Sequence, residues 1–389
     1  MSNLFMLVAL AFMFIRSKNT LTTLLVFLVI MHFLEVVFVE FFFGKEFSTK
    51  AAMFDSLNVV GNCLFIFVII FYFFNGKLSD VKSLDSTIMR FRPVDVIPFL
   101  LMSSYAVFIY YKSVIVKSLD YHLISEGSLP IDEYMIVLFT VMLIFSKSRF
   151  LVLFSFMLIA FIYAYTGERL KFLVMLYTTY LLLKDLYNVR VPFKVVVFLA
   201  LFFAIFLDIV RSQDVGSQTE AIHMSHFGEL SITSMYLLDF TENLSLLERS
   251  QAFAGIFLGN LIPSSLLPVG FDIKRMLSYQ TNVPGGGWLP VWFFAVAGYF
   301  GVIVISLMTS FLCRIFLKSL NNMVSMHKRK ELMFLCFISF NSSAVIWFMY
   351  SPYVVFKFII YSALIYGGYK ILIPFTSRPK TLSKNAQSV

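Results

Sequence analysis

The stretch that decides the fold runs from Leu21 to Phe43 and reads LTTLLVFLVIMHFLEVVFVEFFF. It is apolar along nearly its whole length, and its ionisable side chains are His32, Glu35 and Glu40. A helix that crosses the hydrocarbon core of a bilayer needs about 20 mainly apolar residues. The stretch therefore predicts a transmembrane helix.

Similar runs recur along the whole chain, and the composition agrees with them. Apolar residues make up 59% of the 389 residues and charged residues 14%, whereas a soluble domain has roughly 45–50% and about 25%. This composition excludes a water-soluble chain. We expect an all-α, polytopic membrane bundle of about eleven transmembrane helices. The further runs are 3–15, 58–75, 96–116, 134–146, 150–165, 172–183, 192–210, 288–313, 332–350 and 353–373.

The basic residues predict the orientation of this bundle. Lys and Arg number 31 against 22 Asp and Glu, which gives a formal charge of +9. Most of these cations fall in one set of alternating loops, and short cytoplasmic loops are enriched in Lys and Arg. We therefore expect the N-terminus outside, the C-terminus in the cytoplasm, and no nucleic-acid partner. The basic set comprises Arg16, Lys18, Lys77, Lys82, Arg90, Arg92, Lys147, Arg149, Lys184, Arg190, Lys194, Arg314, Lys318, Lys328, Arg329, Lys330, Lys370, Arg378, Lys380 and Lys384.

The chain divides into four parts around one long connection. Residues 1–210 hold eight predicted helices, 211–287 form a large outer loop, 288–373 hold three helices, and 374–389 form a cytoplasmic tail. A loop longer than about 15 residues is usually functional or disordered. This loop contains an apolar stretch from Ala252 to Leu267 that Asn260 interrupts. We expect an interfacial or re-entrant segment packed on the bundle, since irregular backbone at membrane depth needs protein or water partners.

Two pairs of polar residues lie in the predicted helices, where they are costly. His32 and Glu35 are three residues apart and share a helix face. They indicate either a proton relay in a transporter or an interhelical hydrogen bond. Asp208 and Arg211 have the same spacing at the end of their helix, and a local ion pair there would direct them toward the long loop.

A short outer turn, Thr166 to Lys171, carries Arg169. Arg169 could anchor a helix end at the interface. Alternatively, its planar guanidinium could bind phosphate oxygens through paired hydrogen bonds. Gly167 would allow this turn to approach a ligand closely.

The long loop holds the residues best suited to proton transfer. His223, His226 and Glu229 follow at spacings of three residues and would share a broad helix face. Either histidine or the glutamate could act as a general base, or all three could be solvated loop residues. Two histidines and a carboxylate without a further ligand make a weak metal site, so we expect no metal or other cofactor. Further cations in this loop are Arg249, Lys274 and Arg275.

A glycine run, Gly285 to Gly287, leads into the ninth helix. We expect a hinge there, with Trp288 and Trp292 in the aromatic belt at the membrane interface. Ala297 and Gly301 form a small-xxx-small pair that predicts close packing of another helix.

Taken together, these features resemble the bacterial O-antigen polymerases (Wzy-like family), which are related to the O-antigen ligases. The likeness comes from the number of spans, the Gly167-Glu168-Arg169 turn, the large external loop and the glycine run before a small-residue-rich helix. It covers most of the chain.

The resemblance implies a lipid-linked glycosyltransferase at the periplasmic face of the bacterial inner membrane. Its substrates would be oligosaccharide repeat units on undecaprenyl pyrophosphate, and its partners membrane lipid, a chain-length regulator and a flippase. Fixed cations would stabilise the pyrophosphate leaving group. Arg169 and Arg211 are the first candidates for this role, followed by Arg249, Lys274 and Arg275. His223, His226 or Glu229 would deprotonate the acceptor hydroxyl.

Two other functions stay open. An O-antigen ligase shares the layout and donor but transfers the finished chain to lipid A-core. A flippase or secondary transporter would show two similar halves with broken helices at matching positions, and the sequence has no such pairing.

Overall fold

The computed structural model describes residues 2–43, 51–81, 104, 107–108, 174–181, 184, 191–197, 199, 226–262, 266–281, 286–322 and 328–376. Within this part of the chain the regular structure is entirely helical, as the sequence predicts. The predicted spans 96–116, 134–146 and 150–165 lie almost wholly outside the described residues, and the spans 172–183 and 192–210 are described only in part.

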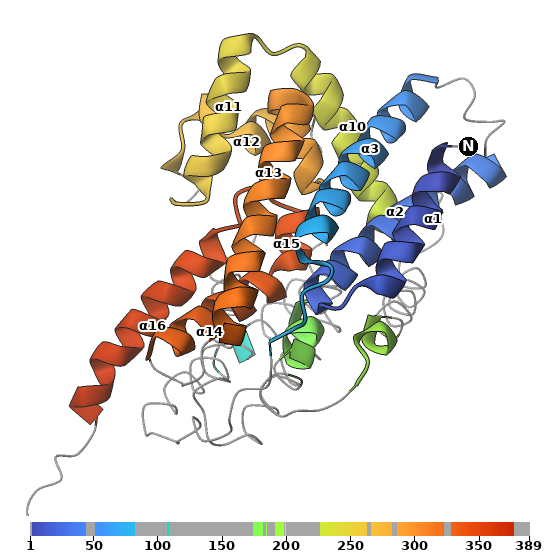
Figure 1. Ribbon diagram of the computed structural model, residues 1–389. Coiled ribbons are helices and arrows are strands. Elements are labelled where there is room, and N and C mark those ends of the chain that lie inside the picture. The colour runs from blue at the N-terminus through green and yellow to red at the C-terminus, as the bar shows by residue number, and fades with distance from the viewer. Residues whose placement is uncertain are drawn as a thin grey trace, which may run out of the picture.

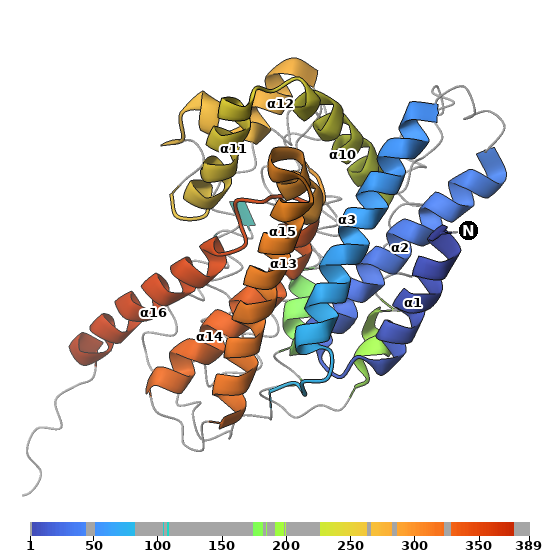
Figure 2. The same cartoon turned by 45° about the horizontal axis from the view of Figure 1, so that its top comes forward.

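The N-terminal third forms three neighbouring helices: α1 (Ser2–Arg16), α2 (Thr20–Phe43) and α3 (Ala51–Asn75). They coincide with the first three predicted runs and lie side by side in Figures 1 and 2. The start of α2 has a local cause, because the side-chain oxygen of Asn19 accepts a hydrogen bond from the Thr22 N–H at 2.8 Å. Such a side chain replaces the partner that a first-turn N–H lacks.

The C-terminal part contains α13 (Leu289–Asn322), α14 (Lys328–Ser342), α15 (Ala344–Met349) and α16 (Lys357–Thr376). The predicted continuous span 332–350 is wrong in one respect, because it breaks between α14 and α15. There the hydroxyls of Ser342 and Ser343 donate to the carbonyl oxygens of Ser339 and Phe340 at 3.3 and 3.2 Å. Such local bonds compete with the helical backbone pattern.

The longest helix, α13, is kinked at Gly298, where φ is 60° and ψ is −156°. Only glycine adopts this backbone conformation easily. The kink brings the carbonyl oxygen of Phe293 within 2.3 Å of the place where a Cβ on Gly301 would lie. The prediction that Ala297 and Gly301 receive another helix is therefore wrong for Gly301, whose missing side chain admits the backbone of α13 itself.

The predicted outer loop is helical over most of its described length. It contains α10 (His226–Glu242), α11 (Leu246–Gly259), the short 3-10 helix η5 (Val269–Phe271) and α12 (Ile273–Thr281). We call these four elements the cap, because Figures 1 and 2 show them gathered around the Leu289 end of α13. The rings of Phe253 and Phe257 in α11 pack edge-on against Phe293 of α13, with centroids 6.0 and 5.7 Å apart.

Two of the described helices are long and apolar enough to cross a membrane, by length and composition. They cover Ser56–Asn75 in α3 and Leu289–Asn322 in α13, and these two helices pack along each other. Shorter apolar helices cover Asn3–Arg16, Thr20–Leu34 and Leu332–Ser342. Large apolar side chains on the outside of α3, α13 and α16, such as Phe73, Phe300 and Leu364, are exposed. This surface suits a hydrocarbon environment better than water.

Candidate functional site where the cap meets the bundle

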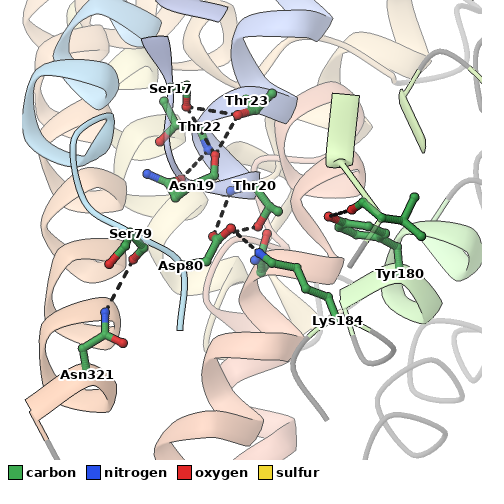
Figure 3. Close-up of polar contacts among 12 residues, drawn as sticks. Ser17, Asn19, Thr20, Thr22, Thr23, Ser79, Asp80, Tyr180, Lys184 and Asn321 are labelled. Atoms are coloured by element: carbon green, nitrogen blue, oxygen red, sulfur yellow. Dashed lines mark hydrogen bonds and ion pairs between the residues drawn. The ribbon is translucent and has the colours of Figure 1, made fainter. Parts of the chain in front are cut away.

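Polar side chains gather at both ends of α13, and the end near Asn322 is described first. We call Asn19, Thr20, Asn75, Asp80 and Lys184 the network, and Figure 3 labels four of them, Asn19, Thr20, Asp80 and Lys184. One carboxylate oxygen of Asp80 accepts hydrogen bonds from the N–H and the hydroxyl of Thr20 at 2.9 and 3.1 Å. The other oxygen pairs with the Lys184 ammonium group. Asp80 therefore binds the first residue of α2 and a residue far along the chain.

The network also joins α1, α3 and α13. The side-chain NH2 of Asn19 donates to the carbonyl oxygen of Asn75, and that of Asn75 donates to the carbonyl oxygen of Ser310 at 3.1 Å. The Lys18 N–H donates to the Gly76 carbonyl oxygen at 3.0 Å. Each link closes a helix end with a backbone partner, so the network holds the bundle together.

Several cations predicted to share one membrane face do meet at this end. Lys184 belongs to the network, and Lys18 adjoins it. The Lys194 ammonium group donates to the Ile15 carbonyl oxygen at 3.0 Å. The Arg314 guanidinium lies 5.8 Å from the Phe74 ring centroid. These contacts give the cations structural roles at helix ends.

The opposite end of α13 joins the cap to the bundle. We call Asn260, Asp272, Gly286, Trp288 and Tyr353 the junction. A Cβ on Gly286 would lie 3.4 Å from Leu230 Cδ2 and 3.4 Å from Tyr350 Cδ1. The first turns of α10 therefore run along the glycine segment.

Ser234 continues this contact along α10, because its hydroxyl oxygen accepts a hydrogen bond from the Trp288 N–H at 3.4 Å. Trp288 is fully buried, and its ring lies edge-on to His32 of α2 and Phe348 of α15, with centroids 5.7 and 5.5 Å apart. The start of α13 is thus enclosed by α2, α10 and α15.

The expectation that Trp288 and Trp292 form an interfacial belt is wrong, because both side chains are completely buried. The Trp292 indole N–H donates to the Gly287 carbonyl oxygen at 3.0 Å. Gly287 is needed for this approach, since a Cβ there would lie 3.0 Å from Trp292 Nε1. The glycine segment thus fits against an indole ring, and the two tryptophans fix the start of α13 within the protein.

Two polar side chains fasten the cap to the connection between α15 and α16. The buried Asp272 carboxylate accepts hydrogen bonds from the Tyr353 hydroxyl at 2.9 Å and from the backbone N–H of Arg275 at 3.2 Å. The Asn260 side chain donates to the Pro352 carbonyl oxygen at 2.7 Å and accepts from the Phe356 N–H at 2.9 Å. The junction is therefore held by side chains from two cap segments that bind the same connection.

Cations lie close to these fastenings. The Arg275 Nε is 3.8 Å from the second oxygen of Asp272, which is ion-pair range but too long for a hydrogen bond. Lys274 precedes it in the first turn of α12. Lys357, at the start of α16 and next to Phe356, is only 8% exposed.

The predicted site residues fall into three groups. Arg169, Arg211 and His223 lie outside the described residues. His226 and Glu229 lie in the first turn of α10, directly before Leu230, which faces Gly286. Lys274 and Arg275 begin α12, which contacts α10. The helices that carry the described base candidates and two cation candidates therefore contact each other, while the grouping of these side chains in one site stays a prediction.

Arg249 has a different place. Its Nε donates to the Leu244 carbonyl oxygen and its Nη2 to the Glu242 carbonyl oxygen, both at 3.2 Å. It thereby covers the carbonyls at the end of α10. Arg249 precedes Asn260 by eleven residues of helix, which is about 16 Å along the axis. These contacts favour a structural role, and a role for Arg249 in substrate binding stays a prediction.

Sequence reasoning missed Asp272, Tyr353, Asn260 and Lys357. Asp272 carried a local signal, since Asp before a helix is a common N-cap. Nothing near Tyr353 in the sequence indicates its partner, because 81 residues separate it from Asp272. Such pairs arise only when the chain has folded.

No family model, curated protein or solved structure matches the chain. Over the described residues, no three His, Cys, Asp or Glu side chains gather closely enough to hold a metal ion.

Proposed function

We propose that the chain is an O-antigen polymerase of the bacterial inner membrane. It would join undecaprenyl-pyrophosphate-linked repeat units into polysaccharide at the periplasmic face. One observation supports the proposal: Leu230, which directly follows the first turn of α10 with His226 and Glu229, and Tyr350 both lie beside Gly286. The segment that carries the base candidates thus approaches the connection to which the cap residues Asp272 and Asn260 are bound.

The reaction assigns each group a task. The hydroxyl oxygen of an acceptor sugar attacks the anomeric carbon of the donor sugar, while His223, His226 or Glu229 takes the hydroxyl proton. The bond from that carbon to the pyrophosphate oxygen breaks, and the electron pair leaves with the pyrophosphate. Arg169 and Arg211, followed by Arg249, Lys274 and Arg275, are our candidates for stabilising the leaving group, since fixed cations act most strongly where water is excluded.

The proposal includes about eleven transmembrane helices, with the network end in the cytoplasm and the cap in the periplasm. The basic residues around the network support this orientation, because positively charged short loops stay in the cytoplasm. The cap would then face the compartment where the energy for polymerisation arrives with the substrate. A chain-length regulator and a flippase are the partners that this function requires.

The decisive test is the lipopolysaccharide ladder of a deletion strain complemented with the wild-type chain. A polymerase predicts single-repeat lipopolysaccharide without the chain and a full ladder with it. Lipopolysaccharide that carries only the core would indicate a ligase instead. An unchanged ladder in the deletion strain would contradict both glycosyl-transfer functions.

Variants test the site. We expect Arg169→Ala, Glu229→Gln and His226→Ala to shorten or abolish the ladder while the protein stays in the membrane. Glu248→Gln is a matched control, because Glu248 is an exposed carboxylate of α11 that bonds only Ser245. Near-normal chain lengths for all three variants would remove Arg169, His226 and Glu229 from the mechanism.

A further inference from the structure

The end of α11 and the residues after it expose large apolar side chains. Leu261 and Leu266 are 61% and 69% exposed, and Leu258 and Ile262 are also accessible. We call these four residues the cap tip. Exposed apolar clusters of this kind mark contacts with protein, ligand or membrane.

The sequence around the cap tip carries no charge. From Ser250 to Phe271 there is no Asp, Glu, Lys or Arg, whereas Arg249 precedes this segment and Asp272 follows it. A docking surface for a soluble protein has a polar, solvated rim. Hydrocarbon excludes charged side chains. The charge pattern therefore favours lipid as the neighbour of the tip.

The backbone of the described tip residues is also suited to an apolar environment. The Leu261 and Ile262 N–H groups both donate to the Leu258 carbonyl oxygen, at 2.9 and 3.0 Å, and the Asn260 N–H donates to the Phe257 carbonyl oxygen at 3.1 Å. Groups in contact with acyl chains need such internal partners, because hydrocarbon offers none.

The position of the tip is set by Asn260, whose side chain binds both sides of the turn before α16. A 20-residue helix such as α16 spans about 30 Å, the thickness of the hydrocarbon core. The tip therefore lies level with the first turn of α16. Figures 1 and 2 both show the lower end of α11 reaching the start of α16.

We infer that Leu258, Leu261, Ile262 and Leu266 insert among the acyl chains of the leaflet on the junction side of the membrane. The other end of α11, with the Ser245 and Glu248 capping box, stays in water. This inference rests on the membrane embedding of the proposed function but not on glycosyl transfer. It makes the cap a membrane-anchored element, with the junction beside the lipid.

Fluorescence quenching by brominated lipid tests this placement. Bimane is attached to the full chain at Leu261→Cys or Leu266→Cys, in dioleoylphosphatidylcholine vesicles with and without dibrominated phosphatidylcholine. Leu364→Cys, on the exposed face of α16, is the membrane control, and Leu247→Cys, near the capping box, is the water control; these leucines are 66% and 67% exposed. The wild-type chain is the blank, because its three cysteines are buried.

We expect brominated lipid to lower the fluorescence about twofold at the tip and at Leu364, with no change at Leu247, since interfacial segments enter the bilayer by about 5–10 Å. Quenching at Leu364 without quenching at the tip would overturn the inference and leave the proposed function standing. No quenching at Leu364 would overturn the membrane embedding as well. Equal quenching at Leu247 and the tip would show that α11 lies flat, which also contradicts the inference. Equal quenching at Leu261→Cys and Leu266→Cys excludes the explanation that one of the two substitutions has disturbed the fold around its own label.

Discussion

The network and the junction use the same chemical device at opposite ends of the bundle. In each, one carboxylate oxygen accepts hydrogen bonds from a backbone N–H at a helix start and from a hydroxyl, while a cation lies near the other oxygen. Asp80 meets its cation at hydrogen-bond distance, whereas Arg275 Nε stays 3.8 Å from Asp272. The same carboxylate arrangement therefore joins helices of the bundle at Asp80 and fastens the cap at Asp272.

The two ends also differ in what surrounds the carboxylate. Asp80 and Lys184 keep 19% and 24% of their side-chain surface accessible, whereas the Asp272 side chain keeps 7%. A buried carboxylate that loses its partners costs more free energy than an accessible one. The junction should therefore be the more sensitive end.

We expect the largest loss of stability from Gly255→Ala, a substitution whose closest contacts lie within the cap. A Cβ there would lie 1.8 Å from the Phe271 carbonyl oxygen, so α11 and η5 must move apart. Overpacking of this kind costs about 3 kcal/mol. Thermal unfolding in detergent measures the loss, and polymer synthesis should fail with it.

Gly270→Ala is the control for this change. Its Cβ would meet only the Gln251 side-chain oxygen, at 3.4 Å, so we expect little effect. Equal destabilisation by the two substitutions would contradict the tight contact between α11 and η5.

Asp272→Ala should cost more than Asp80→Ala. The first removes the α12 cap and leaves the buried Tyr353 hydroxyl without its acceptor, which amounts to about 3 kcal/mol. The second breaks a partly solvated cluster, for which we expect about 1 kcal/mol. Unfolding midpoints of both variants check the order, and the reverse order would break the comparison between the two ends.

A double-mutant cycle sharpens this prediction. Tyr353→Phe removes only the hydroxyl, and its coupling to Asp272→Ala should be about 1.5 kcal/mol, the value for a hydrogen bond to a charged group. Additive effects would mean that the 2.9 Å contact contributes nothing to the attachment of the cap.

A smaller effect is expected within the glycine segment. Gly287→Ala brings a Cβ to 3.0 Å from Trp292 Nε1, whereas Gly286→Ala reaches ordinary contact distance at 3.4 Å. We expect about 1 kcal/mol for the first and nearly none for the second. Thermal unfolding with tryptophan fluorescence distinguishes them, and a shift of the tryptophan emission in Gly286→Ala alone would contradict this assignment.

The smallest effect concerns acid. Two hydrogen bonds from Ser245 lower the pKa of Glu248 below its ordinary value of 4.5. A lowered folded pKa stabilises above the unfolded pKa, and this contribution is lost as the pH falls through the folded value. The protection factors for hydrogen exchange at the start of α11, which are corrected for the slower intrinsic exchange in acid, should therefore fall slightly as the pH drops below 4.5. Glu248→Gln should remove this pH dependence, and an unchanged dependence would assign it to another group.

The sequence predicted the helices better than their ends and contacts. Apolar runs located α1, α2, α3, α13 and α16, because a helix satisfies its backbone polar groups within a continuous apolar segment. It did not predict the kink at Gly298 or the break before α15, which depend on a single backbone conformation and on serine hydroxyls. The burial of Trp288 was also not predicted, because the sequence pattern of an aromatic residue at a helix end is the same whether the ring faces the membrane interface or the protein core.

The site residues that the sequence proposes stay predictions. His226, Glu229, Lys274 and Arg275 stand out from the sequence as rare polar groups in an apolar chain, and the structure places their segments together. Asn260 was recognised only as an interruption of an apolar stretch, although its side chain fastens the cap. The sequence could not predict the partner atoms, because the two turns that meet are far apart along the chain.

By itself, the sequence determined that this protein is helical and apolar enough for a membrane, since those properties follow from the length and character of continuous segments. It also predicts that basic loops recur on one side of the membrane, which stays a prediction. Only the tertiary structure decided that Asp80 and Asp272 end up with matching partners, that the cap closes over the start of α13, and that the cap tip stays exposed. These features depend on hydrogen bonds and packing between distant segments, whose free energy appears only when the chain brings them together.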